Sequence, residues 1–449
     1  MSTDHKKLDA TTVDAAIRSA GLHSLRVSFV DQHGLLHTKT VEASRWLSIH
    51  RDGIAMPGSL LIKDTGNTYA VGLWTASGLA SLDAMIGAQD MLLRPDPTTF
   101  RILPWVDGTG WILCDLFQTT GEPIELSTRR LCRRAATAVE EAGFHSLFGL
   151  ELEFHLYDEA SGVPIHPGWD LLSEPLADRV ADQLEPIRKG LLALGLGPRS
   201  IEIELGPGQI EMNFTPADAV QAADNAVLIR SAIGQIARRN GMRASFMCRP
   251  TPESFTSGWH LHQSLVDSAG NNAFMADDGL LSPVGLQWLG GLLEHGAASC
   301  VLTTPTVNGY KRYRAGSVVP DRIAWSKQHR GAMVRMIGGP NDPATHLENR
   351  VGDPAANPYL YIASQLVAGL DGLQREIVPP LQMTDADAVP ADQLPRSLGD
   401  AIASFAQSAL YRSTWGDEVV DYLVALKRSE WGRFLATVTD WEQKEYALL

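Results

Sequence analysis

Residues 148–158, FGLELEFHLYD, have the pattern of a β-strand with acidic side chains on one face. Side chains alternate across a strand, so Glu151, Glu153 and His155 share one face and the apolar residues share the other. Two carboxylates about 7 Å apart repel each other unless a cation lies between them. A solvated edge strand carrying two acids is the alternative interpretation of this segment taken alone.

A second acidic strand is predicted in IEIELGPGQIEMNF, residues 201–214. Glu202 and Glu204 face away from the aliphatic side chains, a Gly-Pro-Gly turn follows, and Glu211 stands three residues beyond the turn. The turn alone indicates only a change of chain direction. Its position between glutamates seven residues apart, Glu204 and Glu211, is more specific.

Two further strands are predicted to add histidine and charged side chains to the same kind of face. SGWHLHQSL places His260 and His262 on one side, and THLENRV places His346, Glu348 and Arg350 on one side. A single histidine more often belongs to a core, whereas a same-face pair can point at one site. Imidazole beside glutamates suits Mg²⁺, Mn²⁺ or Zn²⁺, and a carboxylate-rich set favours the harder cations.

A cationic stretch lies between these last two strands, in YKRYR and KQHRGAMVR. Arg312, Arg330 and Arg335 are candidates to hold phosphate or carboxylate groups through paired hydrogen bonds, whereas Lys311 and Arg314 are interpreted as solvated. The glutamates of the four strands carry a charge of about −5, and two divalent ions would return about +4. This near-balance is the requirement of a two-metal phosphoryl-transfer site.

The composition is that of an ordinary globular protein. The chain has 449 residues, of which 44% are hydrophobic and 20% charged, and a formal net charge of −14. This length predicts two or three domains, or one large domain with an appendage. The acidic balance argues against nucleic-acid binding. The absence of a long apolar run or an apolar leader predicts no membrane association and a cytoplasmic location.

The first hundred residues are predicted to form a small unit. A helix is expected over 8–21 and a hairpin over 24–41, where apolar residues alternate around a turn. The proline-punctuated segment 92–105 is expected to be a linker, with a domain boundary near residue 110.

Helices are predicted to flank the acidic strands. Ser127 is a candidate N-cap for a helix that stops at Gly143, and Thr215 with Pro216 is expected to open a helix that runs to Gly241. Alternating strands and helices allow a parallel sheet, but strands with polar side chains facing inward argue against one.

In chain order, these motifs resemble those of the glutamine synthetase family: ELE, EL-GPGQ-E, SGWHLHQSL, NGYKR, the pair Arg330 and Arg335, and ENR followed by DPAANPYL. The likeness runs over most of the chain, and its tail is similar to the γ-glutamyl–amine ligase branch that includes glutamate–putrescine ligase. It implies an α+β fold with a β-grasp-like N-terminal domain over 1–110. A catalytic domain over 111–449 would hold a funnel of antiparallel strands backed by helices. It also implies homo-oligomers of stacked rings, commonly dodecamers, in which a neighbour's N-terminal domain completes each site.

The resemblance implies roles for individual side chains and two or more Mg²⁺ or Mn²⁺ ions per site. The metal ligands would be Glu153, Glu204 and Glu211 for one ion and Glu151, His260 and Glu348 for the other. Arg312 and Arg350 would bind the carboxylates of the acid substrate, with Glu153 and His260 beside it. Arg330 and Arg335 would face the transferring phosphoryl group. His262 and Ser264 would lie near the nucleotide. ATP would convert the γ-carboxylate of glutamate to an acyl phosphate, and a neutral amine would then displace phosphate.

Two departures from the family pattern concern the amine. Ammonia-using members have a glutamate where this chain has Val318, and an aspartate from the neighbouring subunit where MPGSL places Pro57, although Asp90 matches another acid of that region. Ammonium binds as a cation, so loss of both acids weakens its site, while apolar replacements favour a larger amine. The expected co-substrate is an organic primary amine, whether polyamine, alkylamine or arylamine.

Other departures and alternatives bear on the remaining substrates. Phe255 and Thr256 replace an Asn-Gly pair that contacts the acid substrate, and His346 replaces an arginine near ATP. An ammonia-using glutamine synthetase and a non-catalytic, synthetase-like regulatory protein are the alternatives. Eroded metal ligands would mark the second, and all six are present here.

Overall fold

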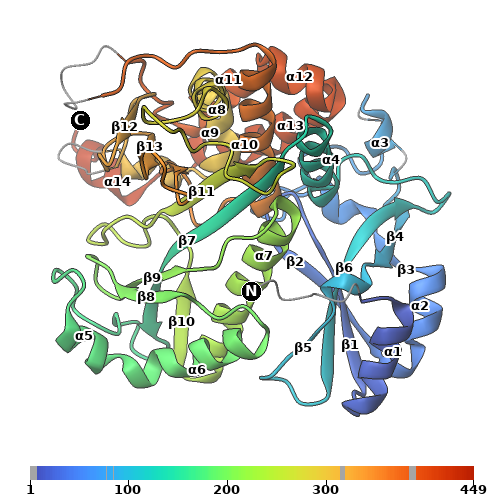
Figure 1. The fold of residues 1–449 in the computed structure, drawn as a ribbon. Helices are drawn as coiled ribbons and strands as arrows, with labels where there is room; N and C mark the ends of the chain where they lie inside the picture. The colour runs from blue at the N-terminus through green and yellow to red at the C-terminus, as the bar shows by residue number, and fades with distance from the viewer. Residues whose placement is uncertain (1–7, 77, 84, 314–318, 384–390) are drawn as a thin grey trace.

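The computed structural model describes residues 8–76, 78–83, 85–313, 319–383 and 391–449. These residues form two mixed β-sheets packed against helices (Figure 1), which confirms the predicted α+β class. Within this part of the chain, no helix is long and apolar enough to cross a membrane.

The first sheet is built from N-terminal residues and has the strand order β2-β1-β6-β4-β3, with β5 paired to β6. Its strands are β1 Ser24–Val30, β2 Leu36–Glu42, β3 Ile54–Pro57, β4 Asp90–Pro95, β5 Arg101–Ile102 and β6 Thr109–Gln118. The predicted hairpin is confirmed as β1 and β2, which pair antiparallel. Asp31 closes their turn, because its Oδ1 accepts the backbone N–H groups of His33 and Leu35, each at 2.9 Å.

The predicted linker over 92–105 is wrong, because this segment contributes two strands to the first sheet. β4 and β5 both pair antiparallel with β6, and Met91 and Leu93 of β4 are buried. Proline is tolerated there because Pro95 stands at the end of β4 and Pro97 opens a short 3₁₀ turn. The boundary predicted near residue 110 falls at the start of β6, which belongs to the first sheet.

The second sheet carries all four predicted acidic strands and has the order β12-β13-β14-β11-β7-β9-β8, with β10 paired to β7. Its strands are β7 His145–Asp158, β8 Ser200–Ile203, β9 Gln209–Asn213, β10 Met242–Ser245, β11 Trp259–Val266, β12 Trp325–Lys327, β13 Val334–Ile337 and β14 His346–Asn349. Among the described strands only β12 and β13 pair in parallel here, so the antiparallel character inferred from the polar-facing strands is confirmed.

Helices cover both sheets, and α8 to α13 gather over one side of the second sheet (Figure 1). The N-terminal helices are α1 Ala10–Ser19, α2 Trp46–Asp52 and α3 Ala80–Asp83. The later helices are α4 Thr128–Glu141, α5 Glu174–Arg179, α6 Ala181–Ala193, α7 Ala219–Arg239, α8 Pro283–Glu294, α9 Gly296–Thr303, α10 Pro358–Gln374, α11 Leu398–Ala406, α12 Ala409–Trp415, α13 Asp417–Leu435 and α14 Asp440–Tyr446.

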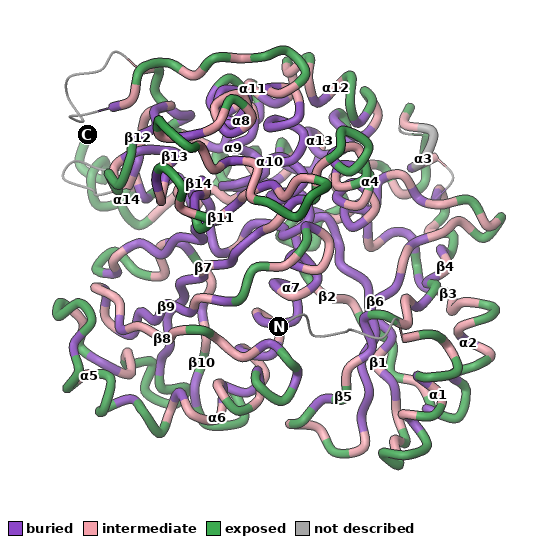
Figure 2. The backbone as a smooth tube through the Cα atoms, in the orientation of Figure 1, coloured by how far each residue is buried: buried purple, intermediate pink, exposed green. Residues whose placement is uncertain are grey.

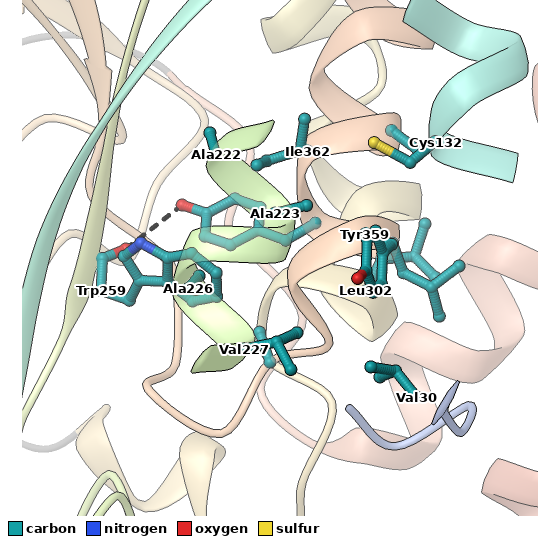
Figure 3. Packing of buried hydrophobic residues seen from close by; sticks show 14 of the residues in the cluster. Val30, Cys132, Ala222, Ala223, Ala226, Val227, Trp259, Leu302, Tyr359 and Ile362 are labelled. Atoms are coloured by element: carbon teal, nitrogen blue, oxygen red, sulfur yellow. Dashed lines mark hydrogen bonds between the residues drawn. The ribbon is translucent and has the colours of Figure 1, made fainter. Parts of the chain in front are cut away.

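The core is centred on α7 and α10, which are buried along most of their length (Figure 2). Small side chains on α7, including Ala222, Ala223 and Ala226, leave room for Trp259 of β11 and Ile362 of α10 (Figure 3). This close packing fixes the position of the strand that carries two of the predicted histidines.

Two predicted helix starts need correction. Ser127 precedes α4 in an extended conformation, but its side chain makes no capping hydrogen bond. The N-cap of α7 is Asp218, whose Oδ1 accepts the N–H of Gln221 at 3.0 Å, rather than the predicted Thr215–Pro216 pair. The chain before Asp218 is extended because Ala217 exchanges two backbone hydrogen bonds with Phe148 of β7.

A buried cluster of ionic hydrogen bonds joins the first sheet to the helices. Arg129 of α4 donates to Asp224 of α7 at 2.8 and 2.9 Å, to Asp115 of β6 at 2.9 Å and to Asp96 beyond β4 at 2.7 Å. Tyr359 of α10 donates to Asp224 at 2.6 Å. One guanidinium therefore connects four elements and compensates three carboxylates.

Candidate active site

Four neighbouring strands bring distant parts of the chain to one face of the second sheet. The strand register pairs Glu151 with His260 across β7 and β11, and Glu153 with Glu211 across β7 and β9. β14 pairs with β11 and places Glu348 on the same face. Residues that stand opposite each other in a sheet have neighbouring side chains, so the register explains why these five converge.

The converging side chains form two groups that share one histidine. The first group is Glu151, His260 and Glu348, and the second is Glu153, Glu211 and His260; within each group, one nitrogen or oxygen per residue lies within 4.8 Å of the others. The two ring nitrogens of His260 face different groups. Nε2 lies 3.8 Å from Oε1 of Glu153, whereas Nδ1 lies 3.7 Å from Oε1 of Glu348 and hydrogen-bonds to Glu151.

Glu204 stands apart from these groups in this structure. It follows β8, and its Oε2 accepts the backbone N–H of Leu205 at 3.1 Å. Its charge nevertheless acts on the site, because after burial it is the largest influence that raises the pKa of Glu153.

When both of its carboxylates are ionised, the second group has more negative charge than its surroundings compensate. Burial, with repulsion from Glu204, raises the pKa of Glu153 to about 8. Burial, with repulsion from Glu151 and Glu153, raises the pKa of Glu211 to about 10. Oxygen ligands that repel each other in a buried setting are suited to a divalent cation, which would stabilise both carboxylates in their charged form.

The first group is stabilised by hydrogen-bond donors and positive charge from the protein itself. Burial raises the pKa of Glu151, but His260 and His262 outweigh it and leave that pKa well below its usual range. Burial likewise opposes ionisation of Glu348, and His260 and Arg350 outweigh it and lower the pKa of Glu348. The carboxylate of Glu348 accepts hydrogen bonds from Arg350 and, at 3.1 Å, from Nη1 of Arg335.

The other predicted arginines, Arg312 and Arg330, are hydrogen-bonded to residues that directly follow β14. Arg312 is 2% exposed, and its Nη1 donates to the carbonyl oxygens of Val351 and Gly352 at 2.9 and 3.0 Å. Its Nε is buried and has no hydrogen-bond partner within the described residues. Arg330 is exposed, and its carbonyl accepts Nε of Arg350 at 3.0 Å.

A cavity of about 460 Å³ adjoins the first group. Glu151, His262, Ser264, His346 and Arg199 are among the residues that line it. Nε2 of His262 lies 3.1 Å from Oε2 of Glu151, and Nδ1 of His262 lies 3.0 Å from Nε2 of His346. The two residues predicted to lie near a nucleotide, His262 and Ser264, therefore share one cavity beside the clustered carboxylates.

Neither position predicted to shape the amine site is found beside the clustered carboxylates among the described residues. Val318 falls outside the described residues. Pro57 ends β3 in the first sheet, where it is exposed and paired in register with Asp90. Trp259, the neighbour of His260 on β11, is buried and packs edge-on against Tyr361 with ring centroids 5.2 Å apart, so it belongs to the core and not to a substrate pocket.

Sequence reasoning missed two amides that hold the carboxylates in place. Nε2 of Gln209 donates to Oε2 of Glu153 at 2.7 Å. Nδ2 of Asn213 donates to Glu211 at 2.8 Å and to Glu202 at 3.3 Å. The spacing carried a signal, because 209, 211 and 213 alternate onto one face of β9.

Comparison with known proteins gives consistent matches over the length of the chain. Residues 125–446 match the family model described as glutamine synthetase, catalytic domain. A γ-glutamylanilide synthase from Acinetobacter sp is 39% identical over 99% of this chain and 96% of that protein. A glutamate–isopropylamine ligase from Pseudomonas sp is 30% identical over 99% of both.

A solved structure described as "GmaS/ADP complex-Conformation 1" superimposes on this fold. The TM-score is 0.84 with 28% sequence identity, and the match covers 97% of this chain and 99% of that chain.

Proposed function

Because the chain belongs to the glutamine synthetase family and is a ligase that forms carbon–nitrogen bonds, we propose that it joins the γ-carboxylate of glutamate to an organic primary amine. The reaction consumes ATP, passes through γ-glutamyl phosphate and yields a γ-glutamylamide, ADP and phosphate. The observation that carries this proposal is the pair of ligand groups that share His260 beside the cavity lined by His262 and Ser264.

The donor set fits two divalent ions, Mg²⁺ or Mn²⁺. Glu151, His260 and Glu348 would hold one ion, and Glu153 with Glu211 would hold the other, joined by Glu204 when its side chain turns inward. When bound, such ions offset the charge on the phosphoryl oxygens of ATP. The high pKa values of Glu153 and Glu211 supply the physical reason for a cation at the second group.

The arginines would act on the two acidic substrates. Arg312 lies close enough to Glu153 for each charge to influence the pKa of the other group, which supports a role in binding a glutamate carboxylate together with Arg350. Arg335 approaches the site from β13, where with Arg330 it would contact the transferring phosphoryl group. Positive charge held at that position stabilises the transition state, in which negative charge spreads over the phosphoryl oxygens.

Among organic amines, an arylamine is the first candidate. The relative named for anilide synthesis is 39% identical to this chain, compared with 30% for the isopropylamine ligase. Val318 and Pro57 add support, because apolar residues stand where ammonia-using members of the family hold carboxylates. An uncharged aromatic amine gains from apolar burial and needs no carboxylate partner, unlike ammonium or a polyamine.

An amine panel tests the proposal directly. Purified protein with ATP, Mg²⁺ and glutamate is supplied with aniline, isopropylamine, putrescine, ethanolamine or ammonia, and phosphate release is measured with product mass. We expect aniline to give the highest kcat/KM and a product with the mass of γ-glutamylanilide. Equal rates with ammonia and with every amine would contradict the pocket argument, and no amine-dependent phosphate release would contradict the ligase proposal.

We also propose that the active unit is a homo-oligomer of stacked rings, in which a neighbour's first sheet completes each site. Pro57 lies in a different sheet from the clustered carboxylates of its own chain, as this arrangement requires. Sedimentation velocity would show a species of about twelve chains, and an active monomer would contradict the proposal.

A further inference from the structure

Gln209, the last residue of the Gly-Pro-Gly-Gln motif, has no assigned role in the proposed reaction. Gln209 is the first residue of β9 and is completely buried. Its side chain contacts Oε2 of Glu153, whereas His260 lies near Oε1.

The amide of Gln209 has one possible orientation. Its Oε1 accepts the backbone N–H of Gly206 at 2.9 Å, so Nε2 faces the opposite way. Nε2 donates to Oε2 of Glu153 at 2.7 Å and lies 3.2 Å from both the carbonyl oxygen of Thr256 and Oγ of Ser257. A flipped amide would set its oxygen against the carboxylate of Glu153 and the carbonyl of Thr256, and its NH₂ against the N–H of Gly206, so these partners fix which atom meets the carboxylate.

The two oxygens of Glu153 are therefore unequal. Oε2 accepts hydrogen bonds from Nε2 of Gln209 and, at 3.0 Å, from the backbone N–H of Gly258. Oε1 is directed towards the shared histidine and lies 3.8 Å from Nε2 of His260. Both hydrogen-bond donors therefore bind Oε2, which leaves Oε1 available to a cation on the side of His260.

We propose that Gln209 is a positioning residue that fixes Glu153 so that it presents only Oε1 to a divalent cation. The amide of Gln209 hydrogen-bonds to the turn at Gly206, to the segment before β11 and to the carboxylate of Glu153. The same group therefore fixes the carboxylate relative to both segments. This inference rests on the proposed role of Glu153 as a metal ligand.

The test is a Mn²⁺ titration that counts free ions by electron paramagnetic resonance. Gln209→Met keeps the volume and removes the amide, and we expect it to weaken one class of Mn²⁺ site roughly 10- to 100-fold. The KM for the metal should rise while kcat recovers at saturating Mn²⁺. A purely structural role would instead lower the active fraction at every metal concentration.

Gln365→Met is the matched control. Gln365 is a buried glutamine of α10 whose amide binds the side chains of Gln263, Asn349 and Ser364. Its loss should lower the melting temperature as much as Gln209→Met does but leave Mn²⁺ affinity unchanged. Equal weakening of Mn²⁺ binding in both variants would overturn the inference.

Glu153→Gln separates this inference from the proposed function. If Glu153→Gln weakens Mn²⁺ binding and Gln209→Met does not, the positioning role is wrong and the metal site stands. If Glu153→Gln itself binds Mn²⁺ as the native protein does, the metal role of Glu153 fails as well. Should Gln209→Met not fold, Ser257→Ala removes one partner of the amide, and native Mn²⁺ affinity in that variant would overturn the inference.

Discussion

At the scale of single residues, Glu348 carries the densest set of ionic contacts in the site. It is 0% exposed, lies next to His260 and accepts hydrogen bonds from Arg335 and Arg350. Its charge is offset by His260, Arg335 and Arg350, to which the proposed function assigns the binding of a metal ion, the phosphoryl group and glutamate. Under that proposal, loss of the charge would disturb the metal ligands and the arginines together.

Glu348→Gln should lower turnover by roughly 10- to 100-fold, because the neutral amide is a weaker ligand and leaves both guanidinium groups without an ionic partner. The measurement is phosphate release with ATP, glutamate and the best amine of the panel. Glu294→Gln, at the exposed end of α8, is the control and should keep native turnover. Native activity of Glu348→Gln would contradict the site.

The raised pKa of Glu153 predicts how stability depends on pH without metal. An acid whose pKa is higher in the folded chain stabilises the fold below its unfolded pKa, and loses that contribution as pH rises through the folded value. The free energy of unfolding in EDTA should therefore fall between about pH 4.5 and pH 8. Urea unfolding measures it.

Two comparisons make this prediction specific. Saturating Mg²⁺ should restore stability at the upper end of the range, because the cation stabilises the ionised carboxylate. Glu153→Gln should show a flatter pH profile than the native protein in EDTA. The same slope in both proteins would assign the pH dependence to other groups.

At the scale of elements, strand register decides what the sequence alone can predict. Alternation correctly predicted the faces of β7, β11 and β14, because the period of a strand is fixed by its backbone. The start of α7 and the strands β4 and β5 were mispredicted, because pairing with β7 and β6 overrode the local proline signals. Gln209 shares the face of Glu211 on β9 but was missed, because the prediction of ligands rested on charged side chains and histidines rather than on amides.

The contact between α8 and α10 makes the packing of these helices testable. A Cβ added at Gly291 would overlap the carbonyl oxygen of Ala368, so Gly291→Ala should destabilise the protein by about 1–3 kcal/mol. Gly234 of α7 has open space around its would-be Cβ, so Gly234→Ala should stabilise by about 0.5–1 kcal/mol. Urea unfolding of both variants would show opposite shifts, and shifts of the same sign would contradict the packing.

At the scale of the whole molecule, the surplus acid of a chain with net charge −14 has structural uses. Part of it forms the ligand groups around His260, and part surrounds Arg129 between the first sheet and the helices. The partners of Arg129 are 14, 33 and 95 residues away in sequence, so no local pattern joins them. The ligand strands were recognisable because each carries its own periodic signal.

Arg129→Met should destabilise the protein by about 3–5 kcal/mol, because it leaves buried Asp224 without its cation. Asp96 and Asp115, in contrast, keep Arg133 as a partner. Thermal unfolding measures the loss. Adding Asp224→Asn to this variant should recover part of the stability, since one uncompensated charge is removed. No recovery would indicate that lost packing, rather than charge, accounts for the effect.

The histidine shared by the two ligand groups makes them chemically distinct. Neutral imidazole has a single ring lone pair, because the other nitrogen carries hydrogen, so His260 can coordinate an ion of one group only. If Nδ1 serves Glu151 and Glu348, the group of Glu153 and Glu211 is left with oxygen donors alone. Nitrogen-containing and all-oxygen sites rank cations differently, so a mixture of Mn²⁺ and Mg²⁺ should divide unevenly between the two positions of one molecule.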